Sequence, residues 1–140
     1  METFLIFICI VLAFISMSFW EAYVEGSHPW AGRSKKDHGR LKITAYHRGV
    51  YAMVFFFLLV PLIIAEFNLR LFGVIVSASA LGFIVEDFLW FIINPYFSLK
   101  DFNSKKVYWY PWLKIGRFEI PFLYVIGILI FVLSWYFLWR

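Results

Sequence analysis

The chain has 140 residues, of which 63% are hydrophobic and only 16% are charged, and its formal net charge is +4. Soluble domains average roughly 45–50% apolar and about 25% charged residues, so this composition excludes an ordinary water-soluble domain. The basic residues gather between apolar runs instead of along one face, which argues against a nucleic-acid-binding protein.

Four apolar runs, each long enough to cross a bilayer, divide the chain. We expect helices at residues 3–24, 44–67, 69–93 and 120–139, with long loops at 26–43 and 95–119. The first run lacks the positive start and the small-residue cleavage site of a signal peptide, so we expect it to be retained as a helix. The sequence therefore predicts an all-α integral membrane protein, a four-transmembrane-helix bundle that forms a single domain over residues 1–140.

The two inner helices and the second loop have further local signals. Only a few residues separate the second and third runs, so these helices are predicted to be antiparallel neighbours. Gly73, Ser77 and Ala80 recur at helical spacing in the third run, a pattern that favours close helix packing in lipid. The second loop is rich in Trp and Tyr, which predicts a segment lying in the membrane interface.

The distribution of Lys and Arg predicts how the bundle is oriented. The first loop with the start of the second helix carries six of these residues, and the second loop carries five. The opposite side has only Arg70 and Arg140. By the positive-inside rule both long loops face the cytoplasm and both termini lie on the non-cytoplasmic side. We thus expect a multi-pass protein of the cell membrane.

An adjacent acid pair, Glu86 and Asp87, lies inside the third apolar run. Ionisable side chains at membrane depth are costly, so they indicate a functional site. In the predicted topology the end of the first helix and the start of the second reach the same level, which adds Glu21, Glu25 and His47 to the layer. We expect Glu86, Asp87 and His47 to be the catalytic residues of such a site.

Two interpretations of this layer remain open. In the first, Glu21, Glu25, His47, Glu86 and Asp87 bind a divalent transition metal, because carboxylates and imidazoles suit such ions. The spacing of these residues matches no standard metal-binding motif. In the second interpretation the acids are structural: they pair with basic residues or accept hydrogen bonds from neighbouring aromatic side chains. The basic residues concerned are Arg33, Arg40 and Arg48.

Several short signatures together resemble a group of small prokaryotic four-helix integral membrane proteins. They include Trp20-Glu21 with Glu25-Gly26, Tyr46-His47, the stretch from Val85 to Phe91 with Asn94-Pro95, and Trp109-Tyr110-Pro111. The resemblance covers most of the chain. It implies a membrane fold and no particular activity.

The sequence leaves three classes of function open. The first is a carboxylate/His site near the cytoplasmic face that binds a cation and acts on a lipid-like substrate, with Arg33, Arg40 and Arg48 binding anionic lipid headgroups. The second is a small proton- or cation-coupled transporter or channel. The third is a non-catalytic scaffold subunit. Membrane lipids are the expected partners, nucleic acid is not, and a homo-oligomer is an open alternative.

Overall fold

The computed structural model describes residues 2–27 and 45–140. Within these ranges four helices are long and apolar enough to cross a membrane. They are α1 (Glu2–Glu25), α2 (Ala45–Ile64), α3 (Leu69–Ile93) and α4 (Phe122–Ser134), which η3 (Trp135–Trp139) continues as a π-helical turn. The predicted bundle of four apolar helices of membrane-spanning length is therefore confirmed. The side of the membrane on which each end lies stays a prediction.

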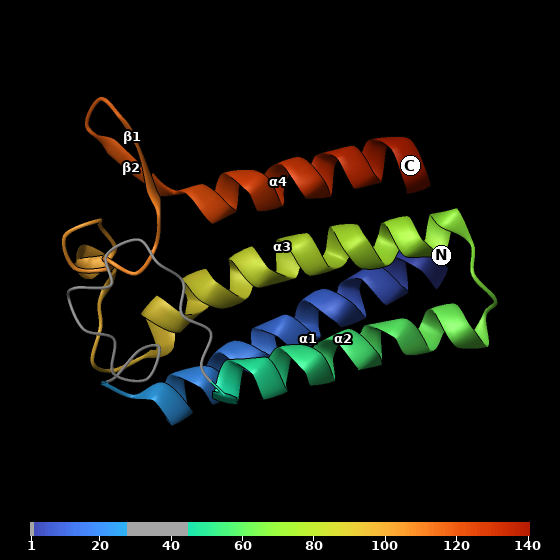
Figure 1. Cartoon of the computed structure of the whole chain (residues 1–140), viewed down its shortest axis with the longest axis horizontal. Helices are drawn as coiled ribbons and strands as arrows, with labels where there is room; N and C mark the ends of the chain where they lie inside the picture. Colours follow the sequence, from blue (N-terminus) through green and yellow to red (C-terminus); the bar gives the residue numbers. More distant parts are fainter. Residues whose placement is uncertain (1, 28–44) are drawn as a thin grey trace.

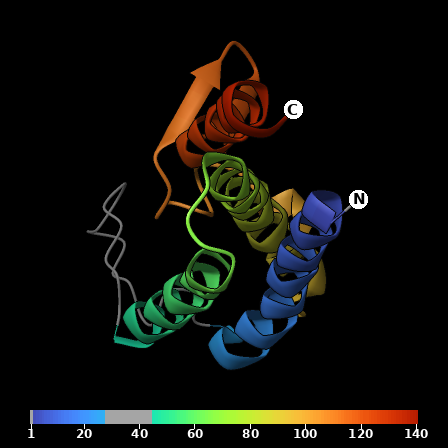
Figure 2. The same ribbon diagram turned by 90° about the vertical axis from the view of Figure 1, so that its right-hand side faces the viewer.

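Helix α3 is the centre of the bundle. It lies between α1 and α4 and packs against both, whereas α2 contacts it only slightly (Figure 2). Two glycines of α3 permit the close approach: Gly82 lies against the ring of Phe14 from α1, and Gly73 lies under Leu138 and Trp139. Ser134 strengthens the second contact by donating to the carbonyl oxygen of Gly73 at 2.9 Å. These contacts agree with the small-residue pattern in the sequence.

The helix ends are defined by local capping. The side chain of Asn68 accepts a hydrogen bond from the N–H of Leu71 at the start of α3. Gly26 follows α1 with a positive φ of 53° and donates to the carbonyl oxygen of Ala22, as a C-terminal glycine cap does. Asn94 ends α3, and its side-chain amide donates to the carbonyl oxygen of Gly26 at 2.8 Å. This bond ties the end of α1 to the end of α3.

The segment between α3 and α4 differs from the sequence-based expectation. It contains a short 3-10 helix, η2 (Leu99–Asp101), and an antiparallel hairpin of β1 (Trp112–Ile115) and β2 (Phe118–Pro121). A two-residue turn with a positive φ at Gly116 joins the strands, and glycine is the residue that such turns favour. Because β2 includes Ile120 and Pro121, α4 begins at Phe122 instead of at residue 120.

The hairpin is fastened to the preceding loop through Glu119. Its carboxylate accepts from the backbone N–H and the hydroxyl of Ser104, and Lys114 lies 3.2 Å away on the neighbouring strand. These hydrogen bonds, and then the ammonium group of Lys114, hold the pKa of Glu119 below its ordinary value.

The Trp- and Tyr-rich loop that precedes β1, called the aromatic loop below, contributes side chains to a buried core. Trp109 and Tyr110 are buried together with Trp90 and Phe91 of α3 and Ala22 of α1. The loop therefore folds back over the ends of α1 and α3. In Figure 1 this capped end and the hairpin lie opposite the end of the bundle that holds the start of α1 and the C-terminus.

Candidate functional site

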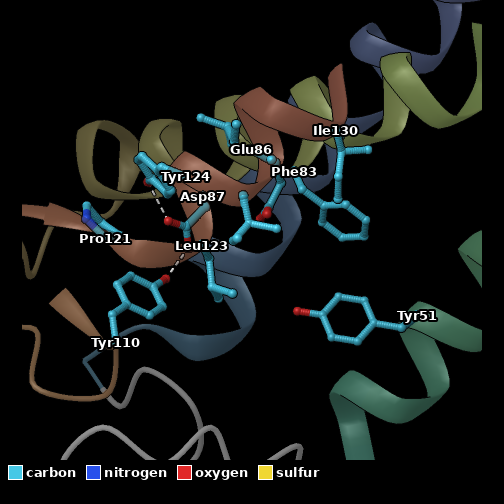
Figure 3. A pocket seen from close by; sticks show the side chains of 13 residues that line it. Tyr51, Phe83, Glu86, Asp87, Tyr110, Pro121, Leu123, Tyr124 and Ile130 are labelled. Carbon is cyan, nitrogen blue, oxygen red and sulfur yellow. Dashed lines mark hydrogen bonds between the residues drawn. The ribbon is translucent and has the colours of Figure 1, made fainter. Parts of the chain in front are cut away.

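Asp87 joins three parts of the chain at the capped end of the bundle. Its carboxylate accepts hydrogen bonds from the hydroxyl groups of Tyr110, in the loop, and Tyr124, in α4 (Figure 3). Hydrogen bonds to an ionised acceptor are about twice as strong as neutral ones. Two tyrosine donors thus stabilise Asp87 as a carboxylate and fix its orientation.

Tyr110 is well suited to this role. Burial raises the pKa of its hydroxyl well above the ordinary value, and the negative charge of Asp87 raises it further. The hydroxyl therefore keeps its proton and remains a donor.

Glu86 faces α1, where it meets Glu21. Both side chains are buried, with only 6% and 7% of their surface exposed, and their carboxyl groups are hydrogen-bonded to each other. A hydrogen bond between two carboxyl groups requires a proton on one of them, because an ionised carboxylate only accepts. Glu21 and Glu86 can therefore share one proton.

Glu25 and His47 form the outer part of the cluster. The Nε2 atom of His47 lies 3.1 Å from Oε1 of Glu25, and both side chains are almost completely buried. The rings of Tyr46 and Tyr51 pack around the imidazole. This contact connects the start of α2 to the end of α1.

Two adjoining cavities meet at these acids. The first is a small polar cavity of about 20 Å³, lined by Glu21, Glu25 and Trp90 among others. The second is an apolar cavity of about 360 Å³ between α3, α4 and α2, with walls that include Phe83 and Ile130. Four residues line both cavities and mark the boundary between them: Tyr51, Glu86, Asp87 and Tyr110.

The close-up of the apolar cavity shows how its polar end is arranged. In Figure 3 the hydroxyl of Tyr51 points from α2 across the cavity toward Glu86 and Asp87. The rings and branched side chains of Phe83, Leu123 and Ile130 surround the remaining space. The cavity therefore has apolar walls and a hydrogen-bonding end, which is the usual design of a small-molecule site.

The structure brings together the acids and the histidine that were predicted from the sequence. Glu21, Glu25, Glu86 and Asp87 line the polar cavity, and His47 reaches it through Glu25. Within the described ranges, however, no group of three or more His, Cys, Asp or Glu side chains is arranged to hold a metal ion. The metal-binding interpretation thus has no geometric support there.

The predicted lipid-binding arginines are only partly described. Arg33 and Arg40 lie outside the described residues. Arg48 is exposed on the first turn of α2. Its proposed contact with lipid headgroups stays a prediction.

The sequence-based site omitted the tyrosines. Tyr124 is an isolated hydroxyl in the otherwise apolar start of α4, a signal that could have indicated a polar contact at membrane depth. The aromatic neighbours of Tyr110 predict only an interfacial segment. Its contact with Asp87 spans 23 positions and could not be inferred from local pattern.

Comparison of the chain with protein-family models, with curated proteins and with solved structures finds no match.

Proposed function

We propose that this protein is a multi-pass membrane protein that binds a membrane-dissolved, lipid-like molecule between α3, α4 and α2. The observation that carries the proposal is the apolar cavity of about 360 Å³ whose one polar end is formed by Glu86 and Asp87. Cavities of roughly 300–1,000 Å³ with apolar walls and a few convergent polar groups are typical of small-molecule sites.

The two acids have different roles in this proposal. Asp87 accepts hydrogen bonds from Tyr110 and Tyr124, so it holds the loop and α4 in place at the wall of the cavity. Glu86 shares a hydrogen bond with Glu21 and also lines the apolar cavity, so it exchanges a proton with the polar group of the bound molecule. His47, beside Glu25, connects the end of α1 to the start of α2.

The cavity is placed where a membrane-dissolved molecule can enter. Its walls come from the middle and the loop-side parts of α3 and α4, both helices of membrane-spanning length. Ile126 and Ile130 line it although each is more than one-third exposed, so the cavity reaches the lateral surface of the bundle. A ligand therefore enters sideways from the bilayer, with its apolar body in the cavity.

A set of probes with one hydrocarbon chain and different polar groups tests the proposal. The probes are hexadecanol, hexadecylamine, palmitate and hexadecyl phosphate, and binding to the detergent-purified protein is measured by native mass spectrometry. We expect at least one probe to bind with one molecule per chain. The Ile130→Trp variant, which fills the cavity, should weaken that binding about tenfold or more.

The matched control is Ile128→Trp, because Ile128 is on the same helix, is 51% exposed and does not line the cavity. It should bind the probe as the parent protein does. Equal binding to both variants, or no one-to-one binding of any probe, would contradict the proposal. Proton-driven flux in liposomes without probe binding would instead indicate the transporter alternative.

A further inference from the structure

Three residues that line the polar cavity, Glu21, Trp90 and Trp109, each have a buried polar side-chain atom without a hydrogen-bond partner among the described residues, and Glu21 and Trp90 provide an acceptor and a donor. Oε1 of Glu21 is an acceptor and Nε1 of Trp90 is a donor, and neither has a hydrogen-bond partner among the residues that the structure describes. Glu21 is 7% exposed and Trp90 is 5% exposed. Both line the polar cavity. Because a buried polar atom without a partner costs about 1–3 kcal/mol, such a pair indicates a site for a polar group.

The chemistry of that group follows from the two atoms together. It must donate to the carboxyl oxygen of Glu21 and accept from the indole N–H of Trp90. A hydroxyl does both, because it has one O–H donor and two acceptor lone pairs. An ammonium group only donates, whereas an ether or an ionised carboxylate only accepts.

The volume and the charge of the polar cavity also favour a hydroxyl group. Its volume of about 20 Å³ exceeds what one water molecule needs by little, so a phosphate or sugar headgroup does not fit. The described residues that line the two cavities include four carboxyl groups and neither Lys nor Arg. An anionic headgroup would therefore be repelled without a compensating cation.

We propose that the ligand is a lipid-like alcohol, a single hydroxyl on a long apolar body. Its hydroxyl donates to Oε1 of Glu21 and accepts from Nε1 of Trp90, and its hydrocarbon part extends past Glu86 and Asp87 into the apolar cavity. This inference depends on the proposed function, since it names the chemical class of the molecule that the same site binds. Fatty and isoprenoid alcohols share this chemistry.

The probe set above, extended by hexadecyl methyl ether, tests the inference through the Trp90→Phe variant. This substitution removes the N–H donor and retains an aromatic ring. We expect hexadecanol to bind best, and Trp90→Phe to weaken its binding about fivefold, the effect of one neutral hydrogen bond. The same variant should leave hexadecylamine unchanged, because an ammonium group accepts nothing from the indole.

The control variant is Trp135→Phe, which changes an exposed tryptophan at the opposite end of the bundle and should alter no probe. Equal binding of hexadecanol and its methyl ether would show that the polar cavity holds only water, and this would overturn the inference. Unchanged hexadecanol binding in Trp90→Phe would do the same.

The outcomes separate this inference from the proposed function. If hexadecylamine or palmitate binds best and Ile130→Trp weakens its binding, the proposed function is supported, but the inference that the ligand is an alcohol is wrong. If Ile130→Trp weakens the binding of no probe, both are wrong. If hexadecanol binds best, a screen of isoprenoid alcohols, with farnesol as the first probe, distinguishes fatty from isoprenoid alcohols as the ligand.

Discussion

At the scale of single residues, Asp87 decides how the capped end of the bundle is held together. It is on α3, and its two hydrogen-bond donors come from the loop and from α4. One carboxylate therefore connects three segments that are 23 and 37 positions apart in the sequence. Glu86, the next residue, points to another side of the helix and meets α1, because successive residues of an α-helix are about 100° apart.

We expect Asp87→Asn to destabilise the protein. The amide group replaces one acceptor oxygen by a donor that faces a tyrosine hydroxyl, and it removes the charge from both hydrogen bonds. The expected loss is about 1.5–3 kcal/mol in the free energy of unfolding, the usual value of a hydrogen bond to a charged group. Unfolding by a denaturing detergent, followed by circular dichroism, measures it.

The control for this substitution is Asp101→Asn. Asp101 accepts from Ser98 at an exposed turn, and asparagine serves there nearly as well. A loss of stability in Asp87→Asn no larger than in Asp101→Asn would show that the tyrosine contacts contribute nothing.

At the scale of elements, α3 packs closely against its neighbours and α2 packs loosely. Helix α3 has many buried small residues and contacts both α1 and α4, whereas α2 is separated from the others by cavities on two sides. One is the apolar cavity near Tyr51, and the other, of about 510 Å³, lies between α1 and α2. Its lining is apolar and includes Phe14, Phe57 and Pro61. The contact of His47 with Glu25 and the short connection before Asn68 hold α2 at its two ends.

Two glycine substitutions test this difference. In Gly82→Ala the new Cβ would lie 2.4 Å from a ring carbon of Phe14, so α1 and α3 must separate or the ring must move. We expect a loss of about 1–3 kcal/mol in the free energy of unfolding. In Gly49→Ala, on α2, nothing lies within 4 Å of the new Cβ. This variant should be more stable by about 0.5–1 kcal/mol, because alanine is the better helix former.

The same detergent-unfolding measurement serves both glycine variants, and each is the control of the other. Opposite signs are expected. Stabilisation of both variants would contradict the close packing of α1 against α3 at Gly82.

At the scale of the whole molecule, the bundle has two different ends. The start of α1 and the C-terminus are at one end, and the aromatic loop, the hairpin and the acid site are at the other (Figure 1). Eleven of the thirteen Lys and Arg residues belong to the segments at the acid-site end by sequence. The positive-inside rule therefore predicts that the site faces the cytoplasm and that both chain termini face outward.

Labelling of single cysteines tests this orientation. In a Cys9→Ser background, Lys105→Cys is in the loop beside the site and Phe67→Cys is in the connection between α2 and α3; both positions are exposed. With a membrane-impermeant maleimide on intact cells, we expect Phe67→Cys to react and Lys105→Cys to react only after permeabilisation. The reverse result would invert the orientation, and equal labelling of intact cells would contradict the four-span arrangement.

The apolar runs of the sequence by themselves determined the helices and their approximate limits. Burial in hydrocarbon depends on the composition and length of a local segment, so a run of about 20 apolar residues is sufficient. The same local logic identified Glu86 and Asp87, because an acid at membrane depth is conspicuous without knowledge of any partner. It could not anticipate the hairpin, in which two short strands depend on pairing with each other.

Only the tertiary structure decided what each acid contacts. Asp87 meets Tyr110 and Tyr124, and Glu86 meets Glu21, because α1, α4 and the loop pack around α3. The two apolar cavities beside α2 likewise depend on how far this helix lies from the other helices. Such contacts join positions far apart in the chain, and their selection depends on the packing of whole elements, which no local pattern of residues contains.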